Sequence, residues 1–142
     1  MKASARNQWF GTVTKIEIGA VNAEVYVILG GGANVVASVT KESVTNLGLA
    51  KGKEVLVLVK APLVIVAADL AGYRLSARNQ LAGTITRVQK GAVNAEVVIG
   101  LAGGDAVAAT ITNESVDSLG LAVGGAATAV FKAGAVILGV AA

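Results

Sequence analysis

The pentapeptide SARNQ stands at residues 4–8 and again, unchanged, at residues 76–80. When residue 4 is set against residue 76, the sequence aligns with itself without a gap as far as Leu70 in the first copy and Ala142 in the second. About half of the paired positions are identical, and an uninterrupted match of this kind is typical of a duplicated structural unit. We therefore expect a domain at residues 1–70, a short polar linker at 71–74 and a second domain at 75–142.

The composition excludes several classes of protein. Hydrophobic residues make up 54% of the chain and charged residues only 15%, which predicts a folded core. Cysteine and histidine are both absent, so disulfides, thiolate metal sites and histidine bases are excluded. The net charge of +3 is spread over single Lys and Arg residues, which does not favour a nucleic-acid partner. No apolar run follows Lys2, so we expect no signal peptide and a cytoplasmic location.

Each repeat has the periodicity of short strands. Residues 12–18 alternate polar and apolar, residues 23–29 do so more loosely, and the glycines at 30–32 predict a turn before a third strand at 34–39. Residues 53–60 form a β-branched apolar run that Pro62 interrupts before the apolar pattern resumes.

A short helix is predicted between the third and fourth strands. Thr40 is a suitable N-cap, about two helical turns follow, and Gly48 is a suitable C′ residue. The order of three strands, a short helix and two strands predicts an all-β fold with short helices, namely two tandem OB-type Greek-key barrels. So small a unit buries little surface alone, so we expect the two units to pair and chains to associate.

The apolar stretch at 119–142 is long enough to be tested as a membrane span. Its counterpart at 47–70 carries Lys, Glu and Asp residues and a proline, so the duplication predicts buried strands here and no membrane partner.

The duplication also shows which polar residues are kept, that is, identical at aligned positions of the two repeats. Most lysines are not: Lys41, Lys51 and Lys53 align with Asn113, Val123 and Gly125. Kept side chains that can donate hydrogen bonds are Ser4/Ser76, Arg6/Arg78, Thr40/Thr112, Ser43/Ser115 and Lys60/Lys132. A site built from such donors suits a small anion that only accepts hydrogen bonds.

Two structural interpretations of the same residues stay open. Thr40 and Ser43 could serve only as helix caps. Glu24/Glu96 and Glu42/Glu114 are also kept, so Arg6 or Lys60 could pair with a carboxylate instead of binding an anion.

These motifs resemble the Mop domain, the small OB-type module of molybdenum-pterin-binding proteins. SARNQ, GAVNAEV (19–25 and 91–97), the T-x-E-S-V-x-x-L-G-L block and the later Lys-Ala pair occur in this order in both repeats. Two such modules in tandem resemble the di-Mop molbindins. The resemblance implies cytoplasmic binding and storage of molybdate, with tungstate as a substitute, by a homo-oligomer that would be a trimer.

The resemblance also implies which residues bind the oxyanion. They are Ser4, Arg6, Thr40, Ser43, Lys60 and Ala61, with Ser76, Arg78, Thr112, Ser115, Lys132 and Ala133. One pocket is expected to mix residues from different units or chains. Asn22 and Asn94 are candidates for a second class of oxyanion site.

Two other functional classes are disfavoured. An OB-fold protein that binds nucleic acid does not fit the small net charge and the 4% aromatic content. An enzyme would need a base, and the kept glutamates are the only kept candidates, so we expect no catalytic residue and no enzyme.

Overall fold

The alternating residues of the sequence form the long first strand of each repeat. The computed structural model describes all 142 residues. In β1 (Asn7–Ile18), Asn7, Trp9 and Val13 are buried, and the register with the next strand shifts after Val13. Such a bulge increases the local twist, which helps a small sheet to curl around its core.

The elements of each repeat follow the predicted order. The first repeat contains β1, β2 (Asn22–Leu29), β3 (Asn34–Thr40), α1 (Lys41–Leu47), β4 (Glu54–Val59), the 3-10 helix η1 (Ala61–Leu63) and β5 (Ile65–Ala67). The second repeat contains β6 (Asn79–Lys90), β7 (Asn94–Gly100), β8 (Ala106–Thr112), α2 (Asn113–Leu119), β9 (Ala126–Phe131), η2 (Ala133–Ala135) and β10 (Ile137–Gly139). The prediction of a mostly β fold with short helices is confirmed.

The predicted helix is confirmed together with its caps. The Thr40 hydroxyl accepts a hydrogen bond from the backbone N–H of Ser43 at 3.0 Å. Gly48 ends α1 in the left-handed conformation, with φ of 63°, which glycine adopts without a steric cost. The second repeat forms the same caps with Thr112 and Gly120.

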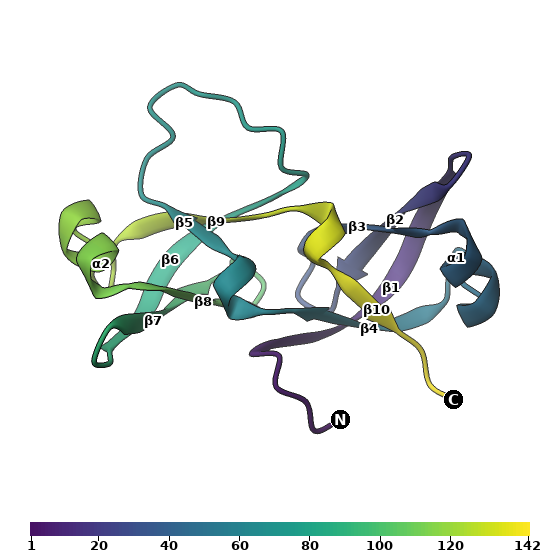
Figure 1. Cartoon of the computed structure of the whole chain (residues 1–142), viewed down its shortest axis with the longest axis horizontal. Helices are drawn as coiled ribbons and strands as arrows, with labels where there is room; N and C mark the ends of the chain where they lie inside the picture. The colour runs from purple at the N-terminus through teal and green to yellow at the C-terminus, as the bar shows by residue number, and fades with distance from the viewer.

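The last strand of each repeat lies in the sheet of the other repeat. The two antiparallel sheets have the orders β10-β4-β1-β2-β3 and β5-β9-β6-β7-β8. In Figure 1 the chain crosses between the two lobes at η1 and η2, and β10 lies beside β4 in the lobe that contains α1. Each sheet therefore takes four strands from one repeat and one strand from the other.

The exchange joins the two lobes through one hydrophobic core. Buried apolar residues of both repeats form a single cluster of 28 residues, to which β5 contributes Val66 and β10 contributes Leu138. The rings of Trp9 and Phe131, from different repeats, lie 6.3 Å apart. Separation of the repeats would expose this shared surface, so we expect the chain to unfold as one unit.

One buried asparagine in each repeat binds the edge strand of the other sheet. The side-chain amide of Asn79 donates to the carbonyl of Val36 and accepts from its N–H, both at 2.8 Å. Asn7 makes the same pair of bonds with Ala108, at 2.8 and 2.7 Å. Since β3 and β8 are edge strands, these amides satisfy backbone groups that would otherwise lack partners.

The hairpins that precede β3 and β8 also touch. The Gly31 N–H donates to the Asp105 carboxylate at 3.0 Å. A Cβ built on Gly103 would overlap the Gly31 carbonyl oxygen, so a side chain at this position would force the hairpins apart.

The apolar C-terminal stretch contains the predicted strands and, between them, the 3-10 helix η2. Its residues form β9 and β10, and the structure contains no helix with the length and hydropathy of a membrane span.

Replacing Asn79 with Ala should destabilise the protein by about 2 kcal/mol, because two buried backbone groups of Val36 lose their partners. Denaturant unfolding measures this change in the free energy of unfolding. Asn34→Ala is the matched control, since Asn34 is exposed at the start of β3 and should change stability by less than about 0.5 kcal/mol. Equal losses in the two variants would contradict the proposed role of Asn79.

Replacing Thr40 with Ala should cost about 1 kcal/mol of stability, because α1 loses its N-cap. The control is Thr45→Ala inside the same helix, which should be neutral or slightly stabilising because alanine has the higher helix propensity. Thermal unfolding followed by circular dichroism compares them. A loss at Thr45 as large as that at Thr40 would exclude the cap as the cause.

Candidate functional site

The kept arginines reach across to the other repeat. The Arg6 guanidinium forms an ion pair with Glu96. Arg78 Nη1 lies 2.6 Å from each carboxylate oxygen of Glu24, and Arg78 Nη2 donates to the Tyr26 hydroxyl at 3.0 Å. The alternative that the arginines pair with carboxylates is therefore realised, but between repeats and on partly exposed surface.

The kept lysines lie just beyond the strands that contain the apolar runs. Lys60 follows β4 and Lys132 follows β9, and both are exposed and form no ion pair. Because Asn7 pairs with Val59 in the antiparallel ladder, the next residues, Arg6 and Lys60, lie side by side. Ala61 and Ala133 begin η1 and η2 and are buried.

The kept hydroxyls lie at the starts of the two short helices. The Thr40 hydroxyl donates to the Ser43 hydroxyl at 2.8 Å, and Thr112 and Ser115 form the same bond. Asn22 is the register partner of Thr40. The candidates for the second class of site are therefore neighbours of the first, since Asn94 likewise pairs with Thr112.

Side-chain contacts and strand register place the candidate residues of one repeat near candidate residues of the other repeat. Asn79 binds Val36, and Arg78 binds Glu24, whose register partner is Ser38, so the chain before Asn79 runs along β3 toward Thr40. Thr40 lies two residues beyond Ser38, about 7 Å along the strand.

The same geometry holds on the second repeat, where Asn7 binds Ala108 and Arg6 binds Glu96, the register partner of Thr110. In addition, η2 packs against β3 and η1 against β8. One group therefore contains Arg78 and Lys132 of the second repeat together with Thr40, Ser43 and Asn22 of the first. The other group contains the aligned residues with the repeats exchanged: Arg6 and Lys60 with Thr112, Ser115 and Asn94. Ser4 and Ser76 are exposed at the N-terminal side of the arginines and make no side-chain hydrogen bond.

A shallow pocket of about 320 Å³ lies on this face of the first repeat, between the ends of β1 and β2. Asn22, Glu24 and Ser38 contribute to its lining. A larger hollow of about 800 Å³ lies on the outer side of β1 and β4, is mainly apolar, and contains none of the candidate residues. The smaller pocket contains one candidate residue, Asn22, and includes Glu24, the carboxylate partner of Arg78.

The charges around Arg78 form a connected network. Lys15 Nζ lies 2.7 Å from the Glu17 carboxylate; the hydrogen bond and then the opposite charge lower the pKa of Glu17 and raise that of Lys15. The Tyr26 hydroxyl, followed by the Glu24 carboxylate, raises the pKa of Arg78 above its usual value. Arg78 is therefore a permanent cation that two neighbouring groups hold in place.

Sequence reasoning missed three residues of this region. Asn7 and Asn79 stand inside the repeated pentapeptide, which was the available signal, but only the structure shows that they anchor the arginines. Tyr26 aligns with Val98, so the duplication gave no reason to select it. No group of three or more His, Cys, Asp or Glu side chains in the structure could hold a metal ion.

Comparison with known proteins identifies both repeats. A model of the TOBE domain matches residues 3–66 and 75–138. A molybdenum transport protein ModE of Herbaspirillum seropedicae is 45% identical over 99% of this chain, and the molybdenum-pterin-binding protein MopA of Rhodobacter capsulatus is 45% identical over 97%. The chain spans about half the length of these curated relatives, 52% in each case.

A solved structure extends the likeness to the whole chain. The cytoplasmic molybdate-binding protein ModG, in a form with molybdate bound, is 54% identical and superimposes with a TM-score of 0.96. The match covers 99% of this chain and 100% of that one. The chain therefore belongs to the TOBE domain family, with one domain in each repeat, and over its whole length it belongs to the same family as the molybdate-binding protein ModG.

Proposed function

We propose that this protein binds molybdate in the cytoplasm and stores or buffers it, as a binding protein and not an enzyme. The observation that carries the proposal is the gathering of kept donors from both repeats at one face of each lobe, in a chain like ModG throughout its length. Molybdate near neutral pH is a tetrahedral dianion with four acceptor oxygens and no proton. Arginine, lysine, hydroxyl and backbone N–H donors complement such an anion.

We propose that each oxyanion site combines the two repeats. One site would use Ser76, Arg78, Lys132 and Ala133 with Thr40 and Ser43, and the other would use Ser4, Arg6, Lys60 and Ala61 with Thr112 and Ser115. Asn22 and Asn94 would belong to neighbouring sites of a second class. The cross-repeat ion pairs and the packing of η1 and η2 on β8 and β3 support this assignment.

Donor chemistry also sets the expected selectivity. Phosphate is partly protonated at neutral pH, and apart from the carboxylates of Glu24 and Glu96, which already pair with the arginines, the proposed sites offer its proton few acceptors. Sulfate has the same charge and shape as molybdate but is smaller, so pocket size must separate the two. Tungstate has nearly the size of molybdate and should bind as a substitute.

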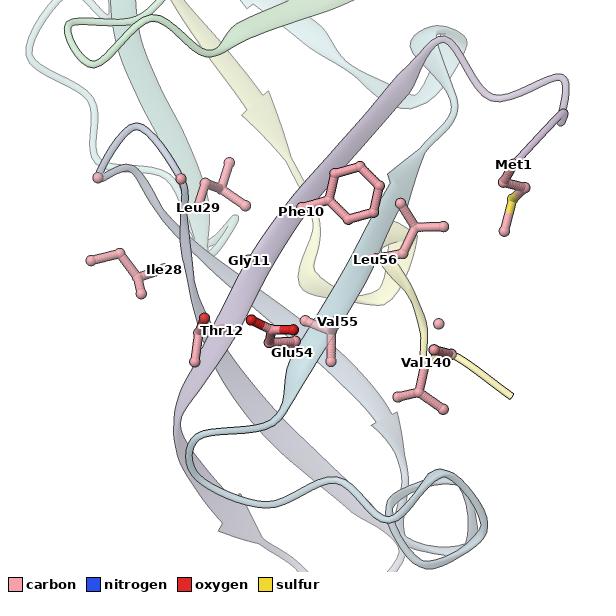
Figure 2. A pocket seen from close by; sticks show the side chains of 14 residues that line it. Met1, Phe10, Gly11, Thr12, Ile28, Leu29, Glu54, Val55, Leu56 and Val140 are labelled. Atoms are coloured by element: carbon pink, nitrogen blue, oxygen red, sulfur yellow. The ribbon is translucent and has the colours of Figure 1, made fainter.

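We propose further that the chains assemble as a trimer through the larger apolar hollow. Figure 2 shows Phe10 and Leu56 side by side on neighbouring strands, with Val140 and Met1 farther along the same hollow. The Phe10 side chain is 76% exposed, which is unusual for phenylalanine and favours a protein partner at this surface. A second copy of the chain is the partner we propose, because MopA and ModG are described as binding proteins for a small ligand and an assembly bearing several sites would suit storage.

Calorimetric titration should show that wild-type protein binds molybdate far more tightly than sulfate or phosphate. Replacing both Arg6 and Arg78 with Ala should weaken molybdate binding at least about tenfold, because each site loses a charge-assisted donor. Tungstate should bind with an affinity close to that of molybdate.

The control for this titration is Lys51→Ala, which removes an exposed cation that the repeats do not share. Circular dichroism of each variant verifies folding. Absence of binding heat with every oxyanion would refute the proposed function, and an equal loss in the Lys51 variant would refute the site assignment.

Replacing Phe10 with Ser should convert the trimer to smaller species without unfolding the chain, because the side chain is exposed within one chain and buried only by assembly. Light scattering during size exclusion gives the mass of the particle. Tyr73→Ser is the control, because Tyr73 is 75% exposed but lies in the linker. A mass unchanged by Phe10→Ser, or a wild-type protein that is a single chain, would contradict the proposed interface.

A further inference from the structure

The two arginines of the pentapeptides have different surroundings. Tyr26 stands on β2 beside Arg78, and the aligned position on β7, beside Arg6, is Val98. This difference bears on anion binding only if the arginines bind the anion, so its effect on affinity rests on the proposed function.

Three hydrogen bonds hold Arg78. Its Nη1 group faces both oxygens of Glu24 at 2.6 Å, and its Nη2 group donates to the Tyr26 hydroxyl at 3.0 Å. The Tyr26 hydroxyl in turn lies 3.3 Å from Glu24 and 3.4 Å from Glu17, and the guanidinium carbon is 5.7 Å from the centre of the tyrosine ring. Tyrosine therefore links the cation to its carboxylate partner.

Arg6 has fewer contacts. It meets one oxygen of Glu96, while the other oxygen lies 3.5 Å from Nη1 of Arg87. Valine at position 98 has neither a donor nor an acceptor in its side chain. The single carboxylate is shared between two arginines, so Arg6 is the less firmly held cation.

We propose that Tyr26 makes the two anion sites of one chain unequal. Its hydroxyl holds Arg78 on Glu24, so the site that uses Arg78 binds a tetrahedral dianion more weakly than the site that uses Arg6. A guanidinium has five N–H donors in a fixed plane. To bind Arg78, an anion must either displace the acceptors that already use these donors or bind the remaining donors close to the Glu24 carboxylate, which repels it.

Another difference between the repeats acts in the opposite direction. Lys41 follows Thr40 at the start of α1, where the second repeat has Asn113. Its exposed side chain forms no ion pair or hydrogen bond, so salt screens its attraction for an anion, whereas direct contacts with Arg78 are screened less. If Lys41 dominated, the Arg78 site would be the tighter one.

The experiment isolates each site with a single arginine variant and titrates it with molybdate at physiological salt. Arg78→Ala leaves the Arg6 site, and Arg6→Ala leaves the Arg78 site. We expect the protein that retains Arg6 to bind about two- to fivefold more tightly, the range for one exposed charge-assisted contact.

Exchanging the differing residue should move the affinities. Tyr26→Phe removes only the hydroxyl, and in the Arg6→Ala background it should remove most of the difference between the sites. In the Arg78→Ala background the same substitution should change nothing, which makes it the matched control. Val98→Tyr in the Arg78→Ala background should weaken binding, because it supplies the missing hydroxyl beside Arg6.

The outcomes separate this inference from the proposed function. If wild-type protein binds no molybdate, both fail. If wild-type protein binds but the single-arginine variants have equal affinities, or the Arg78 site is tighter, or Tyr26→Phe has no effect, the inference fails and the proposed function stands. Unfolding midpoints measured for every variant show whether an affinity change results from loss of structure.

Discussion

The exchange of the last strand between the repeats is the constraint on which the other features of this structure depend. β5 completes the sheet of the second repeat and β10 completes the sheet of the first, so neither lobe has a full sheet from its own sequence. Each crossing brings η1 or η2 against an edge strand of the other lobe. A unit this small would bury little surface alone, and the exchange gives the two units a common core.

The pentapeptide SARNQ makes further contacts between the two repeats, and these contacts reach the surface. Its asparagine supplies an amide that pairs with the free edge of β3 or β8, and its glutamine closes the preceding turn, with Gln8 Nε2 donating to the Ala5 carbonyl at 3.0 Å. The arginine that directly precedes the asparagine is thereby directed onto the other repeat, at Glu96 or Glu24. In the function that we propose, structural and functional roles are divided among adjacent residues, which explains why the whole motif recurs in both halves.

The oxyanion site that we propose is an interface site in its chemistry. Cations come from one repeat, while helix-capping hydroxyls and strand amides come from the other. A site of this kind exists only when both halves are folded and joined, which couples ligand binding to the stability of the whole chain. The carboxylates of Glu24 and Glu96 orient the arginines, and in the site that we propose they compete with the anion for the guanidinium donors.

The sequence by itself determined the duplication, the order of the strands, both helices with their caps, and the identity of the kept donors. These are local properties: period-two hydrophobicity, an N-cap threonine and a C′ glycine act within a few residues. Only the tertiary structure decided which sheet receives β5 and β10, which asparagines bridge the lobes, and that Arg6 and Arg78 meet the carboxylate of the opposite repeat. The physical reason is that the repeats are nearly alike, so a three-residue strand such as Ile65–Ala67 has an equally suitable apolar pattern for either sheet. The choice between them depends on where the chain turns at η1 and η2 and on the packing of the two lobes, which no local pattern in the sequence records.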